Sequence, residues 1–282
     1  MRKVFRTTTY RYPHEQVILA LTLLMVLLVI AVTATATVCL SVIFVAAMLA
    51  LSFLMTRSHH QSLLEKAYPV TPQNNSALAA LVQESVDRLQ PGPVQVFVAA
   101  SREMNAYTFG LSSPKVVVLQ FPILEAMDAD EIRFILGHEL GHVSLGHTWL
   151  NSLVGGMAGI PSPFAASIVL NIAFLWWNRA CEFSADRAGM LACGNPRKAI
   201  SALVKLEAGA GAEVMSKKKL EQVVARIEAE DDHFLSGLGE VLGTHPMTVR
   251  RIEELRRYAT TAEYRRLRTA MDRNAAASGT AG

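Results

Sequence analysis

The chain has 282 residues, 51% of them hydrophobic, and a mean hydropathy of +0.27. This apolar content exceeds what a soluble enzyme of one or two domains needs, which predicts contact with a lipid bilayer. The formal net charge is only +3, so the composition gives no indication of nucleic-acid binding. Three cysteines without paired spacing argue against a disulfide framework and indicate a reducing compartment.

The N-terminal part is predicted to form a transmembrane helical hairpin. Residues 1–16 are basic and are expected to be a cytoplasmic flank, and residues 17–55 contain no charged residue, glycine or proline. As one straight helix, residues 17–55 would reach about 58 Å, nearly twice the roughly 30 Å hydrocarbon layer. Two shorter spans with a turn near Thr33–Thr37 fit better, and basic residues at both ends place both ends in the cytoplasm. A signal peptide would have a much shorter apolar core.

A linker over residues 56–75 precedes a catalytic domain predicted over residues 76–273. Apolar residues at helical spacing indicate a helix from Ser76 to Leu89. Two β-like runs follow, at residues 94–98 and 115–120, so we expect a small sheet and an α+β, mainly helical domain.

Between the two β-like runs, Asn105, Tyr107 and Gly110 are candidate substrate contacts. The edge of a small sheet can bind an extended peptide through main-chain hydrogen bonds. A structural strand and turn explains these residues equally well.

The central motif is H-E-x-x-H, at His138, Glu139 and His142, inside a helix predicted from an Asp128 cap to Gly146. Residues four apart lie on one face of a helix, so both imidazoles can bind one zinc ion. Glu139 lies about 100° further round the helix and can act as the general base toward a metal-bound water. The alternative is an amphipathic helix with two unrelated histidines.

A third ligand is needed for a catalytic site. His147 lies on roughly the opposite face of the helix, and Leu145 and Thr148 occupy the positions where the metzincin pattern requires glycine and histidine. Glu182 is the better candidate, because it would complete a site of two histidines and a carboxylate for one zinc ion per chain. Asp186, four residues on, could accept the free N–H of a ligating histidine. Alternatively, both acids form surface salt bridges with neighbouring arginines.

Between the motifs, residues 149–178 carry no charge and divide at residues 159–163, which include two prolines. Both flanks are tied to the same zinc ion, so the segment must return to the side from which it left. A short membrane hairpin or a re-entrant insertion meets that condition; a hydrophobic core insertion is the alternative. Trp149, Trp176 and Trp177 are expected at the membrane interface.

The motifs together resemble the membrane-bound gluzincin metalloproteases, which include HtpX-type, Oma-type and CAAX prenyl proteases; HtpX-like proteases are most similar in size and layout. The resemblance rests on H-E-L-G-H from His138 and E-F-S-A-D from Glu182, with support from the segment at Asn105 and from H-P at His245 followed by Arg251. It implies a zincin-type fold and places His245 and Arg251 near the zinc, where they could stabilise an oxyanion. A helix start is the other interpretation of His245.

The predicted function is therefore zinc-dependent hydrolysis of peptide bonds by a multi-pass enzyme of the cell (inner) membrane, with its catalytic domain facing the cytoplasm. The resemblance implies quality control of misfolded membrane proteins. A CAAX-type prenyl-protein protease and a non-catalytic zinc-binding adaptor are alternatives, although an adaptor has no need of Glu139. Residues 274–282 are expected to be a disordered tail. The sequence does not predict the oligomeric state.

Overall fold

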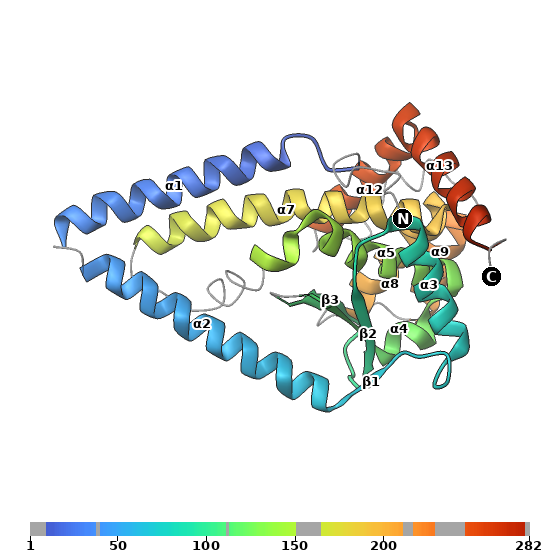
Figure 1. Ribbon diagram of the computed structural model, residues 1–282. Coiled ribbons are helices and arrows are strands. Elements are labelled where there is room, and N and C mark those ends of the chain that lie inside the picture. Colours follow the sequence, from blue (N-terminus) through green and yellow to red (C-terminus); the bar gives the residue numbers. More distant parts are fainter. Residues whose placement is uncertain are drawn as a thin grey trace.

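The computed structural model describes six stretches of the chain, and structural statements here concern those residues. The stretches are residues 10–37, 40–110, 113–150, 165–210, 217–228 and 246–279. Two long helices and half of a third extend away from a body that contains a small sheet and the remaining helices (Figure 1).

The chain begins with two apolar helices, α1 (Glu15–Ala36) and α2 (Leu40–Glu65), which diverge after a break between them (Figure 1). The break lies directly after the turn predicted at Thr33–Thr37. Within the described residues, only α1 is long and apolar enough to cross a membrane, so the second span of the predicted hairpin is not established. The linker predicted over residues 56–75 contains regular structure, because α2 continues to Glu65 and a short strand follows.

The sheet has four strands in the order β1-β2-β4-β3. β1 (Ala67–Pro69) is antiparallel to β2 (Val94–Ala99), which is parallel to β4 (Lys115–Gln120). β3 (Ala106–Phe109) is antiparallel to β4 and forms one edge. The predicted small sheet is therefore present, with α3 (Ser76–Leu89) connecting its first two strands.

The predicted motif helix is α5 (Ala129–Leu145), which follows the short α4 (Phe121–Ala126). Asp128 accepts hydrogen bonds from the first turn, and the Glu131 side chain accepts one from the Asp128 N–H, which completes a capping box. Gly146 ends the helix in the left-handed conformation, with φ of 79°, which a residue without Cβ adopts without strain.

α5 packs closely against α7 (Ala165–Cys193) through small residues. A Cβ built on Gly137 would lie 2.4 Å from Ala192 Cβ, and one built on Gly141 would lie 2.7 Å from Ala188 Cβ. Any larger residue at these glycines would push the helices apart. The glycines next to both motif histidines thus allow α7 to approach the predicted metal site.

Four helices complete the described chain: α8 (Pro196–Ala210), α9 (Lys217–Glu228), α12 (Pro246–Ala259) and α13 (Ala262–Gly279). α8 and α12 both contact α7, and Leu203 and Leu206 of α8 and Arg251 of α12 border the predicted site. α13 continues to Gly279, past Asn274, where composition predicted disorder to begin.

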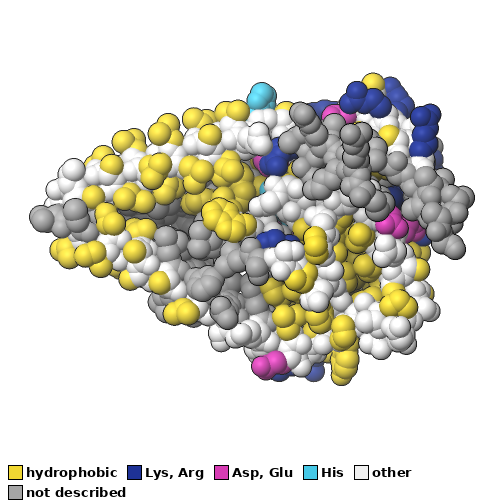
Figure 2. All heavy atoms as spheres, in the orientation of Figure 1, with side chains coloured by type: hydrophobic (Ala, Val, Ile, Leu, Met, Phe, Trp, Pro, Cys, Tyr) yellow, Lys and Arg dark blue, Asp and Glu magenta, His cyan; other side chains and the backbone are white. Residues whose placement is uncertain are grey.

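Hydrophobic side chains lie along α1 and the first part of α2, whereas Lys and Arg side chains gather around α12 and α13 (Figure 2). Several leucine and isoleucine side chains on α1 and α2 are more than 60% exposed. They are Leu24, Leu27, Leu28, Leu40 and Ile43. An apolar surface of this extent on long helices is suited to lipid rather than water.

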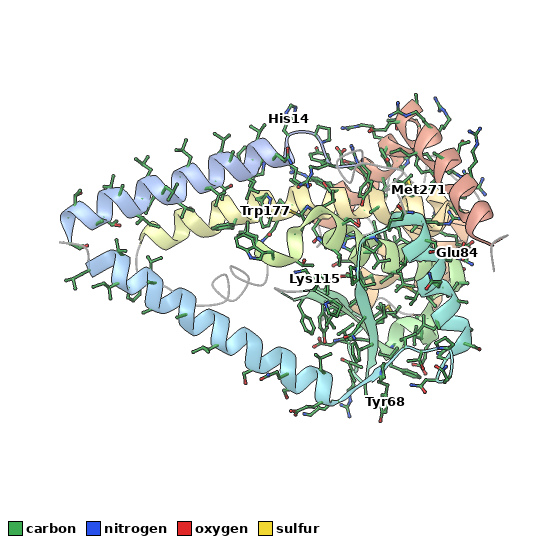
Figure 3. All side chains as sticks on the ribbon, viewed as in Figure 1. His14, Tyr68, Glu84, Lys115, Trp177 and Met271 are labelled. Carbon is green, nitrogen blue, oxygen red and sulfur yellow. The ribbon has the colours of Figure 1, made fainter. Side chains whose placement is uncertain are left out.

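The predicted membrane insertion is only partly described, because residues 151–164 lie outside the described residues. Its second half is the N-terminal part of α7, which lies alongside α1 (Figure 1). Trp149 and Trp176 are 54% and 56% exposed, in keeping with an interfacial position. Trp177 was wrongly assigned there: it is 2% exposed and projects from α7 into the interior (Figure 3).

Candidate metal centre

The three predicted ligands converge from α5 and α7. His138 Nε2 and His142 Nε2 are 3.2 Å apart; Glu182 Oε2 lies 3.5 Å from the first and Glu182 Oε1 lies 3.5 Å from the second. One donor atom from each residue lies within 4.8 Å of the other two. Two imidazoles and a carboxylate in this arrangement could hold a divalent metal ion with a position left for water.

Asp186 and Arg251 support this cluster. Asp186 Oδ1 lies 2.9 Å from His138 Nδ1, the contact expected of an acceptor that orients a ligating imidazole. Arg251 donates two hydrogen bonds to Asp186, at 2.8 and 2.7 Å, and its Nη1 lies 3.2 Å from Glu182. Arg251 therefore does reach the site, but its guanidinium is occupied by the acidic residues. Its predicted role toward an oxyanion gains no support from these contacts.

The charges around the cluster favour a bound cation. Burial raises the pKa of Glu182, but the Arg251 charge and the hydrogen bond with His142 outweigh it and hold this pKa well below its ordinary value. For Asp186, burial is likewise outweighed by Arg251, and the pKa is lowered. Both carboxylates therefore remain ionised at neutral pH.

Glu139 lies beside the ligands and is 6% exposed. Its Oε2 accepts a hydrogen bond of 2.6 Å from the Thr108 hydroxyl on β3. Sequence analysis missed Thr108, because a threonine in a short strand carries no signal of a catalytic contact. The sequence indicates a role for Thr108 only through its position between the candidate substrate contacts Tyr107 and Gly110.

A cavity of about 290 Å³ opens over the cluster and the edge strand β3. It is lined by Asn105, Ala106, Tyr107, Thr108, Phe134, Ile135, His138, Glu139, His142, Thr148, Glu182, Leu203, Leu206 and Arg251. Of the candidate substrate contacts, Asn105 and Tyr107 therefore line the cavity. Gly110 does not; its carbonyl accepts a hydrogen bond from Lys115. The remaining candidate, His245, lies outside the described residues.

Two further buried residues adjoin the centre, and sequence analysis assigned a role to neither. His147 Nδ1 lies 3.0 Å from His142 Nδ1, and His147 Nε2 lies 3.0 Å from a carboxylate oxygen of Glu15. Burial lowers the pKa of His147 to about 4 in spite of the hydrogen bond to Glu15, so the imidazole is neutral. The signal that could have found Glu15 is an acid placed directly at the start of a long apolar segment.

Residues 72–259 match peptidase family M48, which is two thirds of the chain. The chain belongs to this family. The predicted resemblance to membrane-bound gluzincins is thus confirmed at the level of the family, and with it the assignment as a metalloprotease.

Curated relatives of the chain include a chloroplast protein and bacterial proteases. The plastoglobule-localized metallopeptidase 48 of Arabidopsis thaliana is 28% identical over 70% of this chain and 61% of its own length, less than two thirds of that protein. A protease HtpX homolog of Paenarthrobacter aurescens is 28% identical over 68% of this chain and 76% of its own length. Protease HtpX of Acinetobacter baylyi is 27% identical over 66% of this chain and 73% of its own length. No solved structure gives a significant match.

Proposed function

We propose that the protein is a membrane-anchored zinc endopeptidase that binds one zinc ion per chain through His138, His142 and Glu182. The convergence of these donors from α5 and α7, at the base of a cavity bordered by an edge strand, carries the proposal. When bound, the ion would act as a Lewis acid toward the peptide carbonyl and would lower the pKa of water.

Glu139 is assigned as the general base, because it is buried beside the ligands and faces the cavity. Thr108 donates to its Oε2, so we assign Oε1 as the oxygen that takes a proton from the attacking water. The same carboxyl then gives the proton to the amine that leaves when the peptide bond breaks. Thr108 fixes the orientation of the carboxylate through both steps.

The substrate is proposed to lie along β3 as an added strand. Among the described strands, β3 pairs only with β4, and Asn105 together with Ala106, Tyr107 and Thr108 of β3 forms one wall of the cavity. Main-chain hydrogen bonds to a strand edge hold any extended peptide, whatever its sequence. The apolar cavity residues Phe134, Ile135, Leu203 and Leu206 then favour substrates with large apolar side chains.

Membrane proteins are the proposed class of substrate, in a quality-control role. Three features support this: the apolar helix α1, the exposed apolar surface of α1 and α2, and the contact of α1 with the helix that carries Glu182. We propose that α1 and the apolar part of α2 form a hairpin in the cell (inner) membrane, with the catalytic domain on the cytoplasmic side.

Digestion of unfolded casein by the detergent-solubilised full chain tests the activity. Wild type should cleave it, and Glu139→Gln should be slower by at least about 10²-fold, because a general base contributes roughly 10²–10⁴-fold. The exposed residue Glu103 provides a control, and Glu103→Gln should cleave like wild type. Equal cleavage by wild type and Glu139→Gln would contradict the mechanism.

A further inference from the structure

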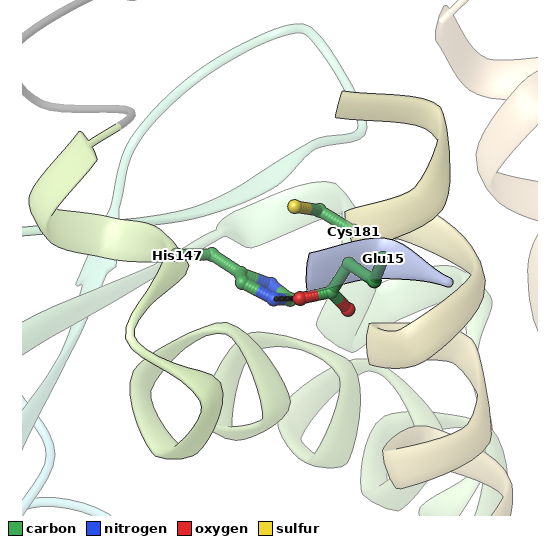
Figure 4. A group of neighbouring side chains, drawn as sticks. All are labelled: Glu15, His147 and Cys181. Carbon is green, nitrogen blue, oxygen red and sulfur yellow. Dashed lines mark hydrogen bonds and ion pairs between the residues drawn. The ribbon is translucent and has the colours of Figure 1, made fainter. Parts of the chain in front are cut away.

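A chain of hydrogen bonds leads from a proposed zinc ligand to the first residue of the apolar helix α1. His142, His147 and Glu15 are its members, and we call it the Glu15 chain. His147 lies directly after Gly146, the residue that ends α5, and the left-handed turn at Gly146 directs it back toward His142. Figure 4 shows the contact between His147 and Glu15.

The hydrogen positions along the Glu15 chain follow from one assignment. His142 Nε2 faces the other ligands, so binding of the ion through Nε2 leaves the ring proton on Nδ1. That N–H points at His147 Nδ1, 3.0 Å away, which must therefore act as the acceptor. His147 then carries its own proton on Nε2 and donates it to Glu15. Every donor faces an acceptor, and reversal of any member would break the series.

The Glu15 carboxylate is buried and fixed, with 1% of the residue exposed. Arg11 donates to one oxygen and the Ser184 hydroxyl of α7 donates to the other. Ser184 Oγ also accepts the Tyr12 N–H at 2.8 Å, and Arg11 donates to the carbonyl of Leu145 at the end of α5. Burial of a carboxylate without such partners would destabilise the folded chain. A glutamate in the first turn of a helix could instead be exposed to water, so the burial of Glu15 indicates a specific role.

We propose that Glu15 is a positioning residue for the metal centre, and that its contact with His147 determines how firmly His142 holds the ion. The inference rests on the proposed zinc site. It makes the start of the membrane helix part of the active centre, so a displacement of α1 by a substrate or by the bilayer would weaken metal binding.

A second metal ion bound by Glu15, His147 and the neighbouring Cys181 is the competing explanation, because their donor atoms also lie within 4.8 Å of one another. The effect of Cys181→Ala on the number of bound ions distinguishes the two explanations.

The experiment measures zinc affinity of the full-length protein in detergent by chelator competition, and the visible spectrum after substitution with Co²⁺. Glu15→Ala should weaken zinc binding about 10- to 100-fold and alter the cobalt spectrum, the size of effect expected when a supporting partner of a ligand is lost. Glu15→Gln should restore most of the affinity, because its amide oxygen still accepts from His147. His147→Ala should weaken binding to a similar extent, and the double variant should be no worse than His147→Ala alone.

Two matched controls separate this role from general packing. Ile18→Ala removes a buried side chain of α1 from the same interface and should lower stability without changing zinc affinity. Cys181→Ala should also leave zinc affinity and stoichiometry unchanged. The inference is overturned if Glu15→Ala affects zinc affinity no more than Ile18→Ala does, or if Cys181→Ala removes a bound ion. Absence of a cobalt spectrum in the wild type would instead overturn the proposed metal site itself.

Discussion

Three acidic side chains around the metal centre have different partners, and the partners account for different roles. Arg251 contacts both Glu182 and Asp186, and a guanidinium opposes protonation of a carboxylate. That environment suits a ligand and the acceptor that orients another ligand. Glu139 instead accepts a hydrogen bond from the neutral Thr108 hydroxyl, a partner compatible with a carboxyl group that takes up and releases a proton.

Replacement of Thr108 tests this contact. Thr108→Val keeps the shape of the side chain but removes the donor, and a hydrogen bond to a charged group contributes about 1.5–3 kcal/mol. We expect kcat/KM for casein-like substrates to fall about 10- to 100-fold while zinc content stays at the wild-type level. Thr108→Ser keeps the hydroxyl and should retain most of the activity. A Thr108→Val enzyme with wild-type kcat/KM would show that the contact does not orient the base.

Residue identity and spacing predicted one site with His138, His142, Glu182, Glu139 and Asp186, and the structure brings these side chains together. Spacing along one helix placed His147 on another face than the two motif histidines. It could not predict that His147 contacts Glu15, because 132 positions separate them and the contact exists only once α1 is docked. Arg251 was placed near the metal by resemblance, but its pairing with acidic residues depends on how α12 packs on α7.

At the scale of elements, the metal centre depends on the distance between α5 and α7. Gly141 has no Cβ, and one built there would lie 2.7 Å from Ala188 Cβ. This close packing places Glu182 of α7 within reach of both histidines of α5. The glycines of the motif region therefore allow the approach that brings the proposed ligands together.

Gly141→Ala should separate the two helices. Overpacking of a tight core costs about 1–3 kcal/mol, and we expect lower thermal stability together with weaker zinc binding. The double variant Gly141→Ala/Ala188→Gly moves the methyl group to the other helix and should recover both properties. Failure of the second substitution to rescue would mean that the loss does not arise from this contact.

The cap of α5 predicts how stability depends on pH. Burial raises the pKa of Asp128, but Lys198 and the backbone N–H groups of the first turn outweigh it, so the pKa is lowered in the folded chain. A lowered pKa gives stabilisation that is complete above the unfolded value of about 3.9 and is lost as pH falls through the folded value.

Asp128→Ala should therefore destabilise the protein by about 1 kcal/mol at pH 7, and the difference from wild type should shrink below about pH 4. Denaturant unfolding in detergent at several pH values measures this. Asp130→Ala, in the same helical turn, removes an acid that does not cap and is the control. A difference that stays constant down to pH 3 would contradict the assignment.

Local signals predicted the elements better than their connections. The helices at Ser76–Leu89 and after Asp128 and the strand at Lys115–Gln120 follow from periodicity, caps and β-branched residues, all of which act within a few positions. The continuity of α7 was not predicted, because its apolar first part and its polar second part obey different patterns. The two parts form one helix that packs against both α1 and α5, and sequence patterns within α7 do not predict these contacts.

At the scale of the whole molecule, the apolar helices lie at one end and the arginine-rich helices α12 and α13 at the other (Figure 2). The candidate metal centre lies between them, next to the start of α1. Such an arrangement suits an enzyme that receives chains at a membrane surface and cleaves them in a polar domain beside it.

Cysteine labelling tests the proposed hairpin. Cys181 and Cys193 are buried, so a chain with Cys39→Ser has little background reactivity. Thr37→Cys, between α1 and α2, should react with a membrane-impermeant maleimide in sealed right-side-out vesicles. Lys66→Cys, after α2, should react only once the vesicles are opened. Labelling of both positions in sealed vesicles would contradict a hairpin with cytoplasmic ends.

The central claim is a single zinc ion shared between α5 and α7, and zinc content per chain tests it most directly. Purified wild type and Glu139→Gln should each retain one zinc ion per chain through dialysis against a chelator, because Glu139 is not a ligand. Glu182→Gln should lose the ion under the same conditions. Retention of zinc by Glu182→Gln, or its loss from Glu139→Gln, would contradict the proposed ligand set.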